Sequence, residues 1–335
     1  MALLEVKNLT TSFKTPQGKV QAVRDVSFEL NEGEVLGIVG ESGSGKSQTM
    51  YTIMGLLAAN GVIESGDIIF NGENIAPSAF KNKKEYDKKM RTLRGNDIAM
   101  IFQDPMTFLN PVLKIETQLI EPLMNHTKMN KQQARTRALE LMRLVGIPSP
   151  EKRITQYPFE FSGGMRQRIV IAIALACNPK LIIADEPTTA LDVTIQAQVL
   201  ELIDTLRRET NAAIIMITHD LGVVAKLCDR VGIMYGGKLV EMGTDKEIFY
   251  DPKHPYTKGL LNCIANPEDD DDKELQPIAG SPPDLLNPPV GCPFVDRCTK
   301  AMKVCKNHMP SVVAFSNTHS SKCWLNDERG AKYND

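Results

Sequence analysis

The sequence lacks three features that define common classes of protein. None of its apolar runs approaches the ~20 residues that a membrane-spanning helix needs. Its first residues, MALLEVKNLT, show no charged segment followed by a long apolar one, which argues against a secretory signal. With 39 basic and 41 acidic residues the formal net charge is −2, which argues against a dominant interaction with nucleic acid. These absences favour a cytosolic chain, in which thiols stay reduced.

The length and a change in composition indicate two domains. A chain of 335 residues is longer than one typical core requires, and no internal repeat is evident. Residues 266–274, NPEDDDDKE, form a run of like charge, and residues 280–293 are rich in proline. Both stretches predict linker or irregular structure. We therefore expect one domain over residues 1–250 and a smaller module over residues 251–335.

Short apolar strands alternate with helical stretches in the first domain. Helical patterning covers residues 47–57 and much of 111–146, whereas residues 73–97 are rich in lysine and predict a solvated surface excursion. The expected strands lie within residues 3–7, 20–39, 34–40, 96–104, 179–187 and 212–220. This alternation predicts an α/β fold with a parallel sheet covered on both faces.

A glycine-rich segment, GESGSGKS at residues 40–47, matches G-x-x-x-x-G-K-[ST] and lies between a predicted strand and a predicted helix. The glycines allow backbone N–H groups to wrap a phosphate, and the helix N-terminus adds partial positive charge. We expect Lys46 to reach the β- and γ-phosphates and Ser47 to hold Mg²⁺. The alternative is a plain glycine-rich turn, which the strand-and-helix context disfavours.

Two further segments follow at intervals that support this interpretation. The strand LIIADE ends in Asp185, expected beside the Mg²⁺ ion, and Glu186, expected to polarise the attacking water. Alone this ending is a weak signal, because any buried strand can end in two carboxylates at a surface. FSGGMRQR precedes it and carries Ser162, which by itself reads as a helix cap.

In this order the segments resemble the ATP-binding-cassette (ABC) ATPases, over residues 3 to about 245. The resemblance implies a parallel core, an antiparallel β subdomain and a helical subdomain over about residues 104–178. It implies that Gln103 and His219 act with Glu186 in catalysis, and that Gln103 joins Ser47 and Asp185 at Mg²⁺. The implied nucleotide-binding residues are Phe13, Gly40, Ser42, Gly43, Ser44, Gly45, Lys46, Ser47, Gln48, Ser162, Gly163, Gly164 and Asp192.

The chain departs from the family signature at Met165, where glutamine is usual. The main-chain N–H groups of the signature remain, so we expect phosphate contact to survive without any polar contact from the usual glutamine side chain. The resemblance implies a two-subunit sandwich, in which ATP lies between the glycine-rich loop of one subunit and the signature of the other.

Several segments resemble the peptide-importer branch of the family, with ATPases of oligopeptide permeases nearest and those of dipeptide and nickel importers as near relatives. They are FQDPMTFLNP, ADEPTTALDVTIQAQ, HPYTKGLL, GSPPDLL and GCPF. The implied partners are a paralogous ATPase, giving a heterodimer, two transmembrane permease subunits and, through the complex, an extracytoplasmic peptide-binding protein, with no nucleic acid. The implied location is peripheral, on the cytoplasmic face of the inner membrane.

Three other functions are weighed against import. A soluble ABC protein acting on ribosomes or DNA is disfavoured by the single cassette and the near-neutral charge. An exporter ATPase is disfavoured because such chains are commonly fused to a membrane domain. A non-catalytic subunit is disfavoured by intact Lys46, Asp185, Glu186 and His219.

Cysteine is sparse except near the end of the chain, where Cys292, Cys298, Cys305 and Cys323 are separated by five, six and seventeen residues. Structural zinc ligands typically stand two to four residues apart, and disulfides are rare in the cytosol. Four thiols near prolines and a glycine suit a [4Fe–4S] cluster. The resemblance agrees, since some ATPases of this branch hold such a cluster in this tail, where it would have a structural role.

Zinc and a metal-free tail remain open as alternatives. The other three cysteines, Cys177, Cys228 and Cys263, are expected to be buried and unpaired.

Overall fold

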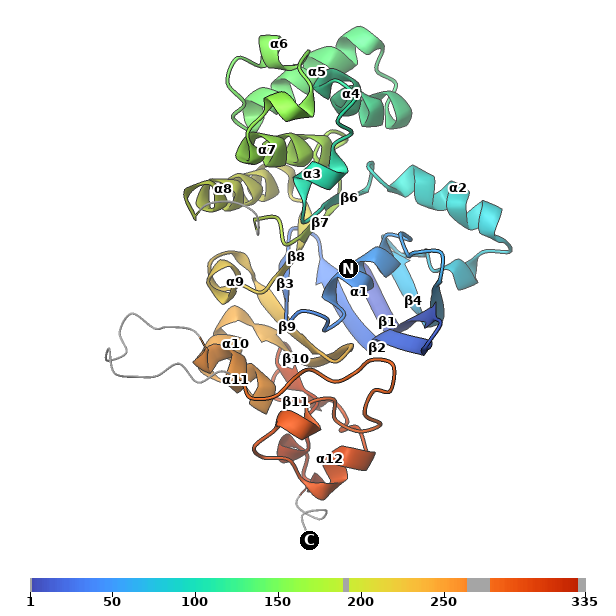
Figure 1. Cartoon of the computed structure of the whole chain (residues 1–335), viewed down its shortest axis with the longest axis vertical. Coiled ribbons are helices and arrows are strands. Elements are labelled where there is room, and N and C mark those ends of the chain that lie inside the picture. The colour runs from blue at the N-terminus through green and yellow to red at the C-terminus, as the bar shows by residue number, and fades with distance from the viewer. Residues whose placement is uncertain (1, 189–192, 264–277, 331–335) are drawn as a thin grey trace. The chain divides into compact units, whose positions relative to one another are not determined.

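The computed structural model describes residues 2–188, 193–263 and 278–330 (Figure 1). The chain forms two compact units. Unit 1 comprises Met1–Leu3, Leu30–Glu34 and Pro77–Ile217, and unit 2 comprises Leu4–Glu29, Val35–Ala76 and Thr218–Asp335. In the part of the chain that the structure describes, no helix is both long and apolar enough to cross a membrane.

Three parallel strands form the sheet of unit 1. They are β6 (Ile98–Ile101), β7 (Leu181–Asp185) and β8 (Ala213–Thr218). The middle strand, β7, pairs with β6 on one side and β8 on the other, and every residue of the three strands is buried. Continuous apolar runs are typical of strands that are covered on both faces, so the expectation of a parallel sheet is confirmed here.

The helices of unit 1 include a packed group of three, α4, α5 and α7. Helix α5 begins with a capping box between Asn130 and Gln133, and its buried residues recur at helical spacing from Ala134 to Met142. The helical elements are η1 (Pro77–Ala79), α2 (Lys83–Leu93), α3 (Pro105–Phe108), α4 (Ile115–His126), α5 (Lys131–Leu144), α6 (Pro150–Arg153), η2 (Pro158–Glu160), α7 (Gly163–Ala174) and α8 (Val193–Thr210).

The lysine-rich segment is mostly exposed or half-buried, as expected, and it also contains helix α2, which no sequence pattern predicted. The Asn82 side chain caps its N-terminus by accepting a hydrogen bond from the Glu85 N–H at 3.0 Å. Met90 and Leu93, one turn apart, are buried. Two buried apolar residues are too few to show as a period in the sequence, but with the cap they are sufficient to anchor a helix whose other side chains are exposed or half-buried.

Unit 2 contains an antiparallel sheet and a mixed sheet. In the first, β1 (Ala2–Thr15) pairs with β4 (Gly61–Phe70), and β4 pairs with β5 (Glu73–Asn74), while β2 (Gly18–Asn31) forms the other edge. In the second, β3 (Val35–Val39) is parallel to β9 (Arg230–Tyr235), which pairs antiparallel with β10 (Lys238–Thr244). This arrangement confirms the α/β class with an antiparallel β subdomain.

The tail at residues 278–330 adds two short strands to the mixed sheet, β12 (Ser320–Ser321) beside β10 and β11 (Val313–Ala314) beside β12. Most of residues 278–330 is irregular, in agreement with the composition. The helices of unit 2 are α1 (Lys46–Ile53), α9 (Leu221–Leu227), α10 (Asp245–Tyr250), α11 (Pro255–Asn262), η3 (Val295–Arg297), α12 (Lys303–Asn307) and η4 (Trp324–Asn326). The acidic run at 266–274 lies outside the described residues.

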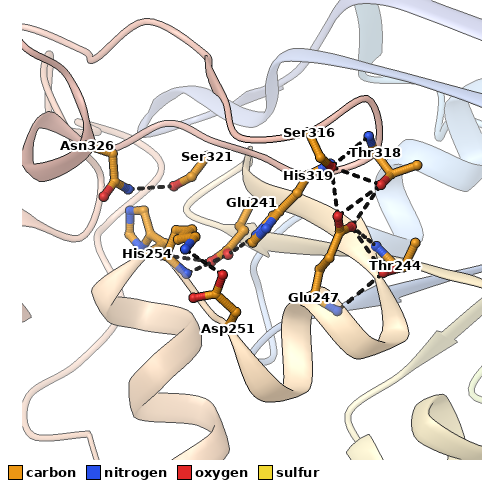
Figure 2. A network of polar contacts seen from close by, with 11 residues as sticks. Glu241, Thr244, Glu247, Asp251, His254, Ser316, Thr318, His319, Ser321 and Asn326 are labelled. Atoms are coloured by element: carbon orange, nitrogen blue, oxygen red, sulfur yellow. Dashed lines mark hydrogen bonds and ion pairs between the residues drawn. The ribbon is translucent and has the colours of Figure 1, made fainter.

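A network of polar contacts docks this tail onto β10 and α10 (Figure 2). Glu241 is buried and accepts hydrogen bonds from the main-chain N–H groups of Lys253 and His254, and His319 Nε2 lies 2.8 Å from its Oε1. Glu247 accepts hydrogen bonds from the Ser316 and Thr318 hydroxyl groups. The tail is therefore held by buried or half-buried carboxylates, in addition to apolar contacts such as that of Phe294 with Tyr235 and Tyr256.

Candidate nucleotide-binding site

The glycine-rich loop follows β3 and leads into α1, which begins at Lys46. Gly45 has a φ of 99°, and a Cβ there would lie 2.4 Å from the Ala22 carbonyl oxygen. A Cβ on Gly40 would lie 2.1 Å from the Met234 carbonyl oxygen. Only glycine fits at these two positions, because the loop passes directly over neighbouring backbone. The tip of the loop, Ser42 and Gly43, is exposed.

Lys46 is buried beneath the loop, and its Nζ donates hydrogen bonds to the carbonyl oxygens of Gly40 at 2.7 Å and Glu41 at 3.0 Å. The Ser44 hydroxyl is also buried and has no hydrogen-bond partner among the residues described. A buried polar atom without a partner is costly, so the loop presents a site for an added hydrogen-bonding group. Ser47 and Gln48 follow in the first turn of α1 and are half-buried.

Two more of the predicted residues belong to unit 2. Phe13 is half-buried in β1, opposite Gly61 of β4, where a Cβ would lie 2.8 Å from the Phe13 ring. His219 is exposed and directly follows β8. It precedes Asp220, whose side chain caps α9 by accepting a hydrogen bond from the Gly222 N–H at 2.8 Å.

The carboxyl ends of β6 and β7 bring three predicted residues together in unit 1. Ile101 and Ala184 are partners in the parallel register, so the residues that follow them leave the sheet at the same edge. There the Gln103 Nε2 donates a hydrogen bond to the Glu186 Oε2 at 2.9 Å. Asp185, the last residue of β7, is buried.

Glu186 has a left-handed backbone, with a φ of 46°, and its N–H donates to the Ile217 carbonyl oxygen at 2.9 Å. This conformation is unfavourable for a residue with a side chain and is found most often at functional sites. It turns the chain sharply at the end of β7, and no sequence pattern predicted it.

The signature segment of unit 1 begins α7. The Ser162 hydroxyl accepts a hydrogen bond from the Met165 N–H at 3.4 Å, so the serine is the N-cap of the helix. Gly163 and Gly164 form its first turn, and a Cβ on Gly164 would lie 2.9 Å from Ile195. The helix N-terminus therefore exposes main-chain N–H groups beside residues without side chains.

Gln167 is a residue that sequence reasoning missed. It is buried in α7, and its Nε2 donates a hydrogen bond to the Pro187 carbonyl oxygen at 2.7 Å. The contact ties the signature helix to the residue after Glu186. The sequence did offer a signal for this residue, because Gln167 is polar at a position where the helical period of α7 predicts burial.

The predicted site residues are thus divided between the two units. Unit 1 holds Gln103, Asp185, Glu186 and the signature, and unit 2 holds Phe13, the glycine-rich loop and His219. Asp192 lies outside the described residues.

The four C-terminal cysteines line one small cavity in unit 2, together with His254 and Trp324. Its volume of ≈ 10 Å³ is room for about one water molecule. Burial raises the pKa of Cys292 to about 12 and that of Cys323 to about 11, so both are thiols at neutral pH. Within residues 2–188, 193–263 and 278–330, no three histidine, cysteine, aspartate or glutamate side chains are placed to hold a metal ion.

The other cysteines differ from one another. Cys228 is buried as expected, Cys177 is half-buried, and Cys263 is exposed. The expectation of burial is therefore wrong for Cys263, which caps the C-terminus of α11 at the edge of the described chain.

Two family models match the chain. The ABC transporter family matches residues 23–189, and the C-terminal region of oligopeptide/dipeptide transporters matches residues 240–305. The dipeptide transport ATP-binding protein DppD of Bacillus subtilis is 54% identical over 328 residues, which is 98% of this chain and 96% of that protein. The oligopeptide transport ATP-binding protein OppD of the same organism is 55% identical over 324 residues, covering 96% of this chain and 88% of that protein.

Solved structures show the same fold. A dimeric ATP-binding cassette in a post-hydrolysis state, bound to ADP and Pi, is 27% identical and superposes with a TM-score of 0.62. The match covers 72% of this chain and 98% of that cassette. The remaining part of this chain extends beyond the cassette.

Proposed function

The chain belongs to the family of ABC transporter ATP-binding proteins, and from this premise we propose that it is the ATP-hydrolysing subunit of an importer for oligopeptides. The observation that carries the proposal is the hydrogen bond from Gln103 to Glu186 beside buried Asp185. It places a carboxylate, an amide and a second carboxylate at one edge of a parallel sheet, where α/β proteins bind ligands. The full-length relatives named for peptide transport support peptides as the cargo.

The glycine-rich loop supplies the proposed phosphate site. Its main-chain N–H groups and the positive end of α1 attract the phosphates, and Lys46 adds a full charge. The unpartnered Ser44 hydroxyl fits such an anion site. Phe13 offers its ring to adenine. The remaining contacts of the loop are assigned to Gly40, Ser42, Gly43, Gly45, Ser47 and Gln48.

Mg²⁺ is assigned to three oxygen donors, Ser47, Gln103 and Asp185, which are the hard ligands that this ion prefers. When bound, the ion would neutralise charge on the phosphates. Glu186 accepts a proton from the attacking water as the bond between the γ-phosphorus and the bridging oxygen breaks, which leaves ADP and phosphate. His219 stabilises the charge that develops on the γ-phosphate.

The second half of each site comes from another subunit. We assign Ser162, Gly163, Gly164 and Asp192 to the nucleotide bound by the partner's glycine-rich loop. The partner is a paralogous ATPase, so the two sites of the heterodimer differ in chemistry. The capped, glycine-lined start of α7 supports this role, since it exposes N–H groups toward an anion.

The membrane partners are two permease subunits, which receive peptide from an extracytoplasmic binding protein, and the chain lies at the cytoplasmic face of the membrane. We assign residues 104–123 to permease docking. Phe108 is 37% exposed and stacks on Phe102 with ring centroids 5.0 Å apart, and Val112 is 76% exposed. Phe108→Glu is expected to uncouple hydrolysis from transport with the subunit still assembled, whereas unchanged coupling would exclude docking at this position.

The cysteine-lined cavity is assigned to a [4Fe–4S] cluster. In such a cluster each thiolate binds a different iron, and four cysteines line this cavity. Their separations in the sequence do not match the short spacing of structural zinc ligands. Burial lowers the pKa of His254 to about 3, and its Nδ1 accepts from the Tyr256 N–H, so Nε2 carries the proton. This Nε2 is buried and has no hydrogen-bond partner among the described residues, and it offers a donor to sulfur.

Loading requires the cysteines to move apart, because the cavity has room for only about one water molecule. The cluster would stabilise a tail that has little regular structure. Protein purified without oxygen is expected to contain iron and sulfide and to be brown, and Cys298→Ser is expected to bleach it. Colourless, iron-free protein from cells that build such clusters would exclude the assignment and leave a metal-free tail.

The transport function is tested by uptake in cells that lack this chain. Labelled oligopeptides, labelled dipeptides and radioactive nickel are supplied in parallel, with the wild-type chain or with Glu186→Gln restored on a plasmid. Restoration of oligopeptide uptake by the wild type alone supports the proposal. Uptake of only dipeptides or nickel would favour the near relatives, and co-purification with ribosomes in place of permease subunits would favour a soluble ABC ATPase.

A further inference from the structure

Arg297 of the C-terminal tail contacts the glycine-rich loop directly. Its Nη1 and Nη2 donate to the two carboxylate oxygens of Glu41 at 2.7 and 3.1 Å, a bidentate pair between residues 256 positions apart. The Arg297 side chain is 6% exposed and that of Glu41 is 26% exposed. A paired guanidinium and carboxylate in this geometry form one of the stronger side-chain contacts in proteins.

All five N–H donors of Arg297 are used. Besides Glu41, it donates to the Tyr235 hydroxyl at 3.0 Å and to the carbonyl oxygens of Ile278 and Ala279 at 3.0 and 2.9 Å. Its guanidinium carbon also lies 5.7 Å from the centre of the Tyr235 ring and 5.9 Å from that of Phe294. An arginine with every donor satisfied and two ring contacts has a single orientation available.

Glu41 is held at each of its polar groups. Its carboxylate accepts from Arg297, its N–H donates to the Tyr256 hydroxyl at 2.9 Å, and its carbonyl oxygen accepts from Lys46 Nζ at 3.0 Å. Arg297 and Tyr256, which make two of these contacts, both follow the segment that matches the ABC transporter family and ends at residue 189. The residue whose carbonyl oxygen holds the Lys46 ammonium is thus itself held by residues of the C-terminal extension.

We propose that Arg297 and Tyr256 are positioning residues for nucleotide binding, which act by holding Glu41 of the glycine-rich loop. The inference rests on the proposed ATP site and adds a role for the C-terminal extension in it. Arg297 neutralises a carboxylate that would otherwise stand unpaired beside the bound phosphates and repel them. Tyr256 holds the main chain of Glu41, whose carbonyl oxygen accepts a hydrogen bond from the Lys46 ammonium.

The test measures the affinity of the full-length chain for a non-hydrolysable ATP analogue with Mg²⁺. Arg297→Gln is expected to weaken binding by about tenfold, within the range of coupling energies for contacting residues. Arg297→Lys keeps the charge but loses the two-pronged geometry, so it recovers part of the affinity. Tyr256→Phe is expected to weaken binding by about threefold, for one lost hydrogen bond.

Arg329→Gln is the matched control. Arg329 belongs to the same tail, but its ion pair is with Asp327, two residues away. The affinity of the Arg329→Gln variant for the analogue is expected to stay within about twofold of wild type. The double variant Arg297→Gln/Glu41→Gln separates the proposal from a misfolded tail. Removing the unpaired carboxylate is expected to restore most of the affinity, as in a double-mutant cycle.

Amide hydrogen exchange supplies a second measurement. Residues 40–45 are expected to exchange faster in Arg297→Gln and at the wild-type rate in Arg329→Gln. Wild-type affinity in Arg297→Gln with unchanged exchange would overturn the proposal, and so would a loss that persists undiminished in the double variant. Failure of the wild-type chain to bind the analogue would instead count against the proposed function, while the exchange measurement would still test the loop.

Discussion

Unit 1 and unit 2 present their candidate site residues by different means. In unit 2 the main chain makes the site, since the loop at residues 40–45 curves over neighbouring backbone and one buried lysine completes it. In unit 1 the side chains make the site, because Gln103 and Glu186 meet at the ends of two strands. We therefore expect substitutions in the loop of unit 2 to weaken nucleotide binding and substitution of Glu186 in unit 1 to slow the chemical step.

This division would be contradicted by a substitution in the loop that affects only the chemical step, or by a substitution of Glu186 that affects only nucleotide binding. The largest effect is expected for Glu186→Gln in unit 1. Turnover should fall by about 10²- to 10⁴-fold, the contribution of one positioned general base, because an amide cannot accept the proton from water. Affinity for ATP should be unchanged. Turnover and nucleotide retention are measured in the assembled transporter, with the partner's own site silenced.

The matched control for this substitution is Glu201→Gln, an exposed glutamate of α8 in the same unit. It should leave turnover unchanged. Near-normal turnover in Glu186→Gln would remove the glutamate from the mechanism.

The next largest effect is expected for Lys46→Ala in unit 2. Loss of the buried ammonium should weaken Mg-ATP binding by about 10- to 100-fold, since one charge-assisted hydrogen bond contributes roughly 1.5–3 kcal/mol. Titration calorimetry on the purified chain measures the affinity, with Lys226→Ala in the exposed face of α9 as control. An unchanged affinity would contradict the assignment of Lys46 to nucleotide binding.

A smaller effect, on stability, is expected where the tail docks. Burial alone would raise the pKa of Glu247, but hydrogen bonds from Thr244, Ser316 and Thr318 outweigh it and lower the pKa from 4.5 to about 2. The unfolded state therefore binds the proton first as pH falls, so the stabilisation is present above pH 4.5 and is lost toward pH 2.

The variant Glu247→Gln tests this docking contact. At pH 7 it should be less stable than wild type by about 1–2 kcal/mol, and the difference should shrink between pH 4.5 and 2. Thermal unfolding across this pH range measures both. Glu29→Gln, on an exposed position of β2, should show no such difference, and an equal pH profile in both variants would contradict the assignment.

The smallest effect is expected for Met165→Gln in unit 1. The Met165 main chain, not its side chain, makes the cap contact with Ser162, so the helix start stays intact. Turnover should change by less than about twofold, the usual range for a substitution away from a core. The change should appear only at the site completed by the partner's glycine-rich loop, and a change at both sites would show that Met165 acts through the fold.

Local patterns predicted much of the fold and the place of the glycine-rich loop within it. Strands β3, β6, β7 and β8 lie within their predicted ranges, because each is a continuous apolar run that ends at polar residues. The glycine-rich loop lies between β3 and α1, as predicted, because its glycines and Lys46 adopt a backbone geometry that consecutive residues encode. The ligand contacts assigned to its residues stay predictions.

The tertiary structure decided the rest. Helix α2 depends on two buried residues that form no visible period in the sequence. The left-handed backbone of Glu186 depends on β8, because the carbonyl oxygen of Ile217 in that strand accepts a hydrogen bond from its N–H. The four cysteines meet His254 at a cavity, and Arg297 meets Glu41 across 256 positions. Sequence patterns report preferences of a chain over a few residues, whereas contacts between distant segments depend on which surfaces pack together and on the burial that makes each polar group require a partner.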